Sequence, residues 1–290
     1  MRLPFPYNVV TFVGDPISPA LLRFDVEPAM RWAERTTGLS DYGDDADEFR
    51  QRVHETVQAA NAVDWNTMGR FGVRYILHWH LSNRLKIVEA LKQFPQIAEV
   101  PVRRPLIITG LFRTGTTYLH NVLAADPRNR AAKMWELCYP VGRKHDPLGD
   151  AKWRRQRGSW AASMNHSFIP DQAEAHLVTA DAYEEDFFLL ENDFSNLKLC
   201  VGLGDYDYAM QMLERDMGSA YRLHKLQLQM LWLQQSAERW LLKAPWHLWE
   251  PRCIAGRIPR RIDHPHASRF GRCDRFPMQL VGSNRGEVPK

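Results

Sequence analysis

The segment PLIITGLFRTGTTYLH, residues 105–120, decides the fold that we expect for this chain. Its apolar start, residues 106–108, is typical of a buried strand, Gly110 opens a tight loop, and a helix is expected from Thr116. The apolar face expected for this helix consists of Leu119, Val122 and Leu123. A strand, a glycine loop and a helix N-terminus aim several backbone N–H groups at one point, where the helix dipole adds about half a positive charge. The segment therefore predicts a loop that binds an anion.

The spacing Gly110-x4-Gly115-Thr116-Thr117 is that of a phosphate-binding P-loop, with one departure. Nucleotide triphosphatases place a lysine where this chain has Thr116, and its loss argues against hydrolysis of ATP or GTP. The loop keeps a cation and three hydroxyls. The candidate nucleotide-binding residues are therefore Arg113, Thr114, Gly115, Thr116 and Thr117. The alternative is a glycine turn that only joins a strand to a helix.

At these residues the chain resembles the sulfotransferases that use 3′-phosphoadenosine 5′-phosphosulfate (PAPS), and it is most similar to the bacterial branch with an Arg-[Ser/Thr]-Gly-Thr-Thr loop. Three further stretches fit that branch: DPRNR (126–130), MWEL (134–137) with Pro140, and LKAPWHL (242–248). The resemblance runs from about Asp25 to Trp249. It implies an α/β fold, a P-loop parallel sheet flanked by helices, in which the loop holds the 5′-phosphosulfate end of PAPS.

Composition sets broad limits on the class of protein. The 290 residues, of which 44% are hydrophobic, can bury one core, and no apolar run approaches the roughly 20 residues of a membrane span. The four cysteines lack metal-ligand spacing and no signal peptide is recognisable, so we expect a cytoplasmic chain without a bound metal. Residues 251–290 carry nine basic and three acidic side chains, which leaves 29 basic against 31 acidic before them. A near-neutral body gives no indication of nucleic-acid binding.

Three regions follow from the pattern of the chain. Residues 1–100 form a helical N-terminal region, with helices expected at 28–37, 46–60 and 68–94. Residues 101–250 form an incomplete P-loop sulfotransferase-like domain, and residues 251–290 are expected to be unstructured. Within the middle region, residues 152–164 predict a basic helix with solvated charges and residues 217–237 a helix with a buried stripe.

The base that deprotonates an acceptor hydroxyl has more than one candidate. We expect residues 131–137 to include a second strand, with Glu136 at its end facing the same crevice as the loop. The resemblance implies a base either on an acid shortly after the loop or on a later histidine, so Glu136 is the first choice and His176 the second. Glu185 is a weaker candidate, in an acidic start to a further helix. The alternative for Glu136 is a surface salt bridge or a helix cap.

Lys243 follows a third predicted strand, residues 240–242. At the carboxyl end of a parallel strand its ammonium can meet the sulfate or phosphate of the donor. We therefore count Lys243 among the candidate catalytic residues, with an exposed lysine of no special role as the alternative.

Beyond Trp249 the resemblance stops. The family continues with a helix, a strand and an arginine-containing stretch that grip the 3′-phosphate of the donor, whereas this chain has scattered prolines and arginines. Codons can be chosen for residues 251–270 such that reading them from the second base gives a different peptide. That peptide has the pattern of an amphipathic helix, a turn, a strand and an arginine. We therefore hypothesise a frameshift near Glu250, with the C-terminal strands missing. The alternative is a genuine basic tail.

Three functions remain open on this basis. The first is transfer of a sulfuryl group from PAPS to the hydroxyl of a small-molecule, lipid or sugar acceptor. The second is an inactive truncated remnant or a nucleotide-binding module, since the segment for the 3′-phosphate is absent. The third is a P-loop kinase, which Thr116 and the lack of a clear magnesium-binding acid disfavour.

Overall fold

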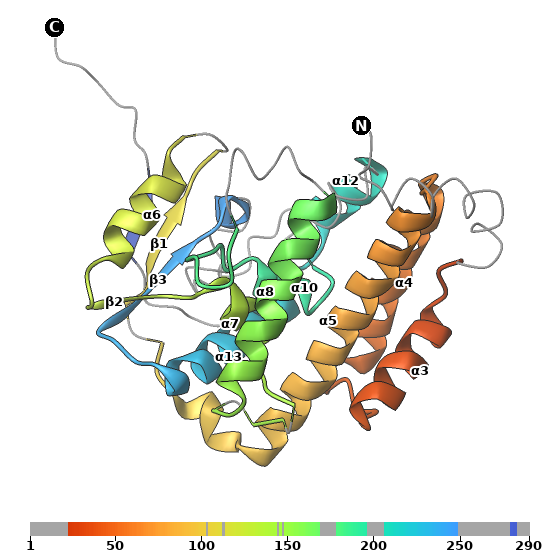
Figure 1. Ribbon diagram of the computed structural model, residues 1–290, viewed down its shortest axis with the longest axis horizontal. Coiled ribbons are helices and arrows are strands. Elements are labelled where there is room, and N and C mark those ends of the chain that lie inside the picture. The colour runs from red at the N-terminus through yellow and green to blue at the C-terminus, as the bar shows by residue number, and fades with distance from the viewer. Residues whose placement is uncertain are drawn as a thin grey trace, which may run out of the picture. The chain divides into compact units, whose positions relative to one another are not determined.

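The computed structural model describes residues 23–102, 104–111, 114–143, 145–146, 148–168, 178–195, 206–248 and 279–282. The chain divides into two compact units (Figure 1). One consists of Met1–Glu89 with Glu191–Glu214, and the other of Ala90–Leu190 with Arg215–Lys290. None of the helices in the described ranges is long and apolar enough to cross a membrane.

The first unit is helical, as predicted from its apolar periodicity. Its helices are α3 (Val26–Thr37), α4 (Ala46–Ala62), most of α5 (Thr67–Gln93) and α12 (Tyr206–Glu214). The N-terminal helices lie within two residues of the bounds expected from the sequence. Helix α3 ends at Gly38, whose φ of 74° is the left-handed conformation that glycine adopts most easily.

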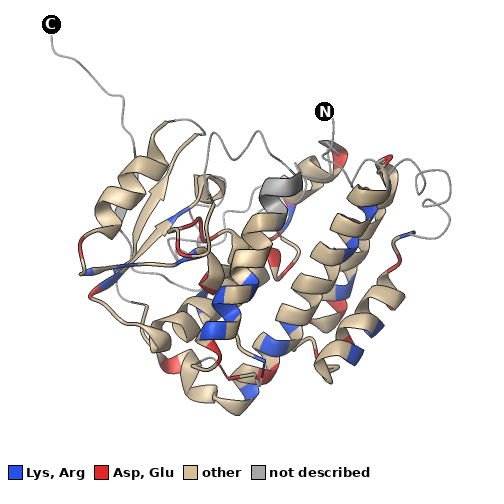
Figure 2. Cartoon of the chain, in the orientation of Figure 1, with Lys and Arg blue, Asp and Glu red and all other residues tan. Residues whose placement is uncertain are grey.

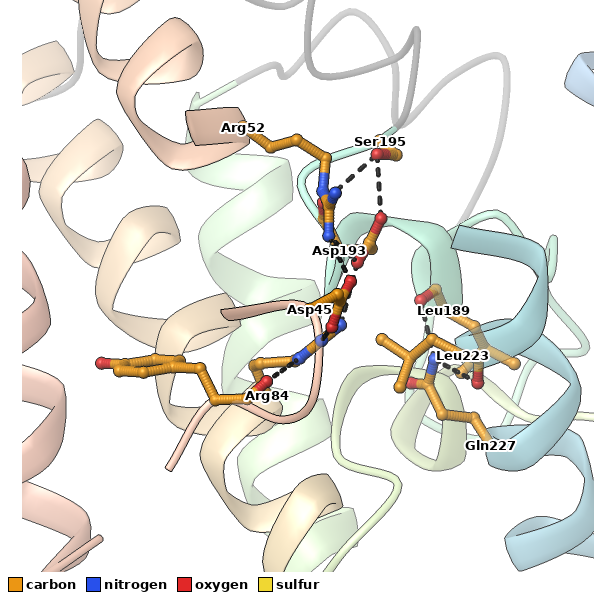
Figure 3. Close-up of polar contacts among 9 residues, drawn as sticks. Asp45, Arg52, Arg84, Leu189, Asp193, Ser195, Leu223 and Gln227 are labelled. Atoms are coloured by element: carbon orange, nitrogen blue, oxygen red, sulfur yellow. Dashed lines mark hydrogen bonds and ion pairs between the residues drawn. The ribbon is translucent and has the colours of Figure 1, made fainter. Parts of the chain in front are cut away.

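Buried charges join the helices of this unit (Figure 3). Asp193 is fully buried, and its Oδ1 accepts hydrogen bonds from Arg52 Nη2 and Arg84 Nη1, each at 2.9 Å. Both guanidinium groups also contact Asp45, while the hydroxyl of Ser195 donates to Asp193 Oδ2 at 3.0 Å. The network joins α4, α5 and the segment after α10, and the attraction between opposite charges offsets part of the cost of desolvating them.

The second unit has the predicted α/β fold. Its strands are β1 (Leu106–Thr109), β2 (Asn129–Ala131), β3 (Arg239–Lys243) and β4 (Gln279–Gly282). All neighbours are parallel, in the order β2-β3-β1-β4. Its helices are η1 (Pro95–Glu99), α6 (Thr116–Ala124), α7 (Met134–Cys138), α8 (Ala151–Phe168), α10 (Phe188–Glu191), α13 (Gly218–Gln234) and η2 (Pro245–Leu248).

Helices cover both faces of the sheet. On one face, α6 contributes to a core cluster made of Ile108, Ala124, Ala131 and Leu241. On the other face, the ring of Trp232 from α13 lies 5.6 Å from the ring of the fully buried Trp240. Residues alternate between faces along a strand, so Leu241 and Lys243 point toward α6 while Trp240 and Leu242 point away from it. This alternation places Lys243 beside the helix of the P-loop-like segment.

Helix α8 carries the predicted basic face. Lys152, Arg155 and Arg157 are exposed along it, and the basic bands are visible in Figure 2. Arg154 is the exception, because it is buried and its Nε donates to the carbonyl of Tyr139 at 2.5 Å.

Three expectations need correction. The strand expected at residues 131–137 is wrong: β2 ends at Ala131, and α7 begins at Met134 because the Glu136 carboxylate accepts the backbone N–H of Lys133 at 2.8 Å and so caps a helix. The apolar face expected for α6 is only partly buried, with Leu119 and Val122 exposed by 36% and 51%. The tail is not wholly unstructured, since Gln279–Gly282 pair with β1 as a fourth strand. The rest of residues 251–290 lies outside the described residues.

Candidate functional site

The loop between β1 and α6 presents an open helix N-terminus. Gly115 has a φ of 85° and precedes the first residue of α6, and apart from Gly115 and its two neighbours no described residue has an atom within 4 Å of the point where a Cβ would stand. The hydroxyl of Thr114 donates to the carbonyl of Leu111 at 2.7 Å and so closes the loop. The first N–H groups of a helix lack partners within the helix, so this end of α6 can accept an anion. Arg113 lies outside the described residues.

Lys243 reaches this helix end from β3. Its ammonium Nζ lies 3.1 Å from Thr117 Oγ1, in the first turn of α6. Its side chain is only 3% exposed and is paired with the Glu185 carboxylate, which is 18% exposed. A usual P-loop has a lysine at the position of Thr116. In this chain the buried Lys243 supplies a positive charge near the loop instead. The structure thus places Lys243 beside the first turn of α6, while its contact with the sulfate or phosphate of a donor stays a prediction.

The segment that carries Glu185 is fixed on both sides. The N–H of Glu184 donates to the carbonyl of Ala132 at 3.1 Å, and the N–H of Asp186 donates to the carbonyl of Lys243 at 3.3 Å. The Asp186 carboxylate also bonds to Lys243, since its Oδ1 accepts the backbone N–H of Lys243 at 2.9 Å. These bonds hold Glu185 at the carboxyl end of β3.

Asp186 also holds two buried histidines. Its Oδ2 lies 2.6 Å from His224 Nε2 and 2.9 Å from His247 Nε2, and the hydroxyl of Tyr221 lies 2.9 Å from His247 Nδ1. Despite complete burial, the neighbouring imidazoles hold the pKa of Asp186 well below its usual range, so it is an anion that accepts hydrogen bonds. Burial lowers the pKa of His224, and its Nδ1 has no hydrogen-bond partner in the described part of the chain.

Asp186, His224 and His247 are also close enough to be considered as metal ligands, since their ligand atoms lie within 4.8 Å of one another. Tetrahedral zinc ligands about 2.0–2.1 Å from the ion stand about 3.4 Å apart. The separations of 2.6 and 2.9 Å are instead hydrogen-bond distances. We therefore describe the three residues as a hydrogen-bonded network.

His120 lies on α6 close to this centre. It is 1% exposed, and burial, followed by the charge of Lys243, lowers its pKa to about 4. Its Nε2 has no hydrogen-bond partner among the described residues. A neutral imidazole at this position avoids a second positive charge beside Lys243.

Glu136 takes part in a buried ion pair. The residue is 3% exposed, and both of its carboxylate oxygens contact the guanidinium of Arg130, which is itself 3% exposed. One oxygen also caps α7 through Lys133. These contacts tie α7 to Arg130 of β2 and cap the start of the helix. The second predicted base, His176, lies outside the described residues.

Sequence reasoning placed Asp186 only in the acidic start of a helix and did not consider His224. His247 stands within the quoted LKAPWHL stretch, but no role was assigned to it. The three residues come from separate segments, so no spacing in the sequence could join them.

The comparisons with known proteins agree with this architecture. The sequence profile of the Sulfotransferase family matches residues 105–260, which is more than half of the chain and includes β1, the loop, α6, β3 and η2. The chain therefore belongs to the sulfotransferase family. No match was found among curated protein sequences.

Two solved structures are similar to this chain. The crystal structure of sulfotransferase STF1 from Mycobacterium tuberculosis H37Rv has a TM-score of 0.66 and 28% identity, covering 78% of this chain and 62% of that one. The crystal structure of sulfotransferase STF9 from Mycobacterium avium has a TM-score of 0.60 and 28% identity, covering 76% of this chain and 57% of that one. This chain thus spans about three fifths of the length of each of these two proteins.

Proposed function

We propose that this protein transfers a sulfuryl group from PAPS to an acceptor hydroxyl. The observation that carries the proposal is the 3.1 Å approach of Lys243 Nζ to Thr117 Oγ1 at the N-terminus of α6. It brings a cation, a hydroxyl and the first N–H groups of a helix to one place. Such a place favours the phosphosulfate of a nucleotide.

The chemistry assigns a role to each of these groups. In sulfuryl transfer, a bond forms between the acceptor oxygen and sulfur as the bond from sulfur to the bridging oxygen breaks. The electron pair of that bond stays on the 3′,5′-diphosphoadenosine that leaves. Lys243, the N–H groups of α6 and the hydroxyls of Thr116 and Thr117 would stabilise this growing negative charge, with Arg113 as a further candidate.

A base must take the proton of the acceptor hydroxyl. Glu136 and His176 remain the candidates that the family resemblance implies. For Glu136 to act, its carboxylate would have to leave both Arg130 and the N–H of Lys133. A different carboxylate, Glu185, already lies beside Lys243. The acceptor itself would be a hydroxyl of a sugar, a lipid or a small apolar metabolite.

Calorimetry with 3′,5′-diphosphoadenosine and with ATP tests the donor. The proposal expects saturable binding of the diphosphoadenosine and much weaker binding of ATP. The reverse order would favour a P-loop kinase and overturn the proposal.

Turnover is tested with PAPS that carries a labelled sulfate, by following label transferred to a panel of alcohols, phenols and sugars and label released to water. Transfer supports the enzyme. Binding without any release of label would favour the second candidate, a nucleotide-binding module or an inactive remnant.

A further inference from the structure

We propose that Glu185 is the base that takes the acceptor proton, and that it stays paired with Lys243 until the donor binds. The inference rests on the proposed function and names the residue that the proposed function leaves open. It concerns the pair formed by Lys243 Nζ and Glu185 Oε1.

The position of Glu185 is set by the backbone on both sides of it. Glu184 is bonded to Ala132 after β2, and Asp186 is bonded twice to Lys243 at the end of β3. The Asp186 carboxylate is held in turn by His224 and His247. A carboxylate on a segment held in this way has a defined position at the carboxyl ends of the strands, the edge at which open α/β sheets bind ligands.

The pair makes Glu185 and the donor compete for one ammonium. The Lys243 side chain is 3% exposed, so its charge needs an anion close by, and in this structure Glu185 supplies that anion. The phosphosulfate of PAPS is also anionic and would be held by the N–H groups in the first turn of α6. When the donor takes the ammonium, Glu185 loses its ion pair with Lys243 beside the sulfuryl group.

The carboxylate, no longer paired with Lys243, can then accept a proton. The acceptor O–H gives its proton to Glu185, the acceptor oxygen bonds to sulfur, and the bridging oxygen leaves with its electron pair stabilised by Lys243. Every atom and charge is accounted for by the donor, the acceptor and these two side chains. The arrangement imposes an order, because Lys243 parts from Glu185 only when the donor is in place.

Glu185→Gln tests whether Glu185 competes with the donor for Lys243 and whether it takes the acceptor proton. The variant keeps the size of the side chain but cannot hold the ammonium as an ion pair or take a proton. Glu238→Gln is the matched control, because Glu238 is an exposed carboxylate just before β3, at the opposite end of that strand from Lys243.

In calorimetry, Glu185→Gln is expected to bind 3′,5′-diphosphoadenosine about tenfold more tightly than the wild type, since a competing anion is removed. With labelled PAPS, release and transfer of sulfate are expected to fall about 100-fold or more, since a general base is lost. Glu238→Gln is expected to match the wild type in both measurements. A residue with a merely structural role would not raise affinity while lowering turnover.

Weaker or unchanged nucleotide binding by Glu185→Gln would show that the carboxylate does not compete with the donor, and would overturn the inference. Sulfate transfer by Glu185→Gln at the wild-type rate would also overturn the inference. Either result would leave the proposed function standing. A wild-type chain that binds the nucleotide but releases no sulfate overturns the assignment of a base. A wild-type chain that ignores the nucleotide removes the proposed function and this inference together.

Discussion

Lys243 and Thr117 lie 126 positions apart in the chain, yet the Nζ of one is 3.1 Å from the Oγ1 of the other. The contact depends on the parallel pairing of β1 with β3, which aligns Ile108 with Lys243. It also depends on α6 covering the face of the sheet to which Lys243 points. A lysine from a distant strand thus lies beside the first turn of the helix that follows the loop.

Replacing Lys243 tests its part in donor binding. Lys243→Met keeps the apolar stem and removes the charge, and we expect the affinity for 3′,5′-diphosphoadenosine to fall about 10- to 100-fold, as for loss of a hydrogen bond to a charged group. Calorimetry measures the change. Lys152→Met, at an exposed lysine of α8, is the control. Unchanged affinity in Lys243→Met would mean that the ammonium does not touch the donor.

Thr117→Val examines the other side of the contact. The loss of a neutral hydroxyl is expected to weaken nucleotide binding about fivefold, and Thr117→Ser is expected to restore it. Because Thr117 and Lys243 touch, their effects should not add. If the double variant lost the full product of the two single effects, the residues would act independently, contrary to the structure.

Glu136→Gln separates a structural role from a catalytic one. The variant leaves the buried Arg130 without a full counter-charge, and we expect a loss of about 3 kcal/mol in the free energy of unfolding, measured with urea, with nucleotide affinity unchanged. The exposed Glu238→Gln should cost little. A Glu136→Gln protein of wild-type stability that no longer transfers sulfate would instead make Glu136 the base.

The lowered pKa of His120 predicts that the free energy of unfolding decreases as the pH falls. Its pKa is about 4 in the folded protein and about 6.5 when unfolded, so the unfolded chain takes up more protons between these values. Stability therefore decreases as the pH drops from 6.5 toward 4, by about 3 kcal/mol from this residue. Urea titrations at several pH values measure it. In His120→Gln this part of the pH dependence should vanish, and an identical slope in the variant would contradict the assignment.

Asp193→Asn tests the charge network of the helical unit. Two buried guanidinium groups, those of Arg52 and Arg84, would lose their shared carboxylate. We expect a loss of about 3–5 kcal/mol in the free energy of unfolding. Asp47→Asn, at an exposed position of α4, is the control. A stability equal to that of the control would show that the network contributes little.

Several features followed from the sequence alone because they depend on neighbours in the chain. The apolar run at residues 106–108, the glycine after it and the helix from Thr116 lie where local pattern predicts them, as do the helices of the first unit. The position of Lys243 at the end of a strand could also be predicted, since the run before it is short, apolar and ended by Pro245. From these and the quoted motifs came the α/β fold and the sulfotransferase family.

The tertiary structure alone decided which charges meet. Glu136 stands near the loop in sequence, but a helix cap and Arg130 hold its carboxylate. Glu185 and Lys243 pair across 58 positions, and Asp186 gathers two histidines from other segments. Such pairs depend on strand register and on which helix covers which face. A periodic pattern reports only whether a side chain is buried, and never which distant partner it finds there.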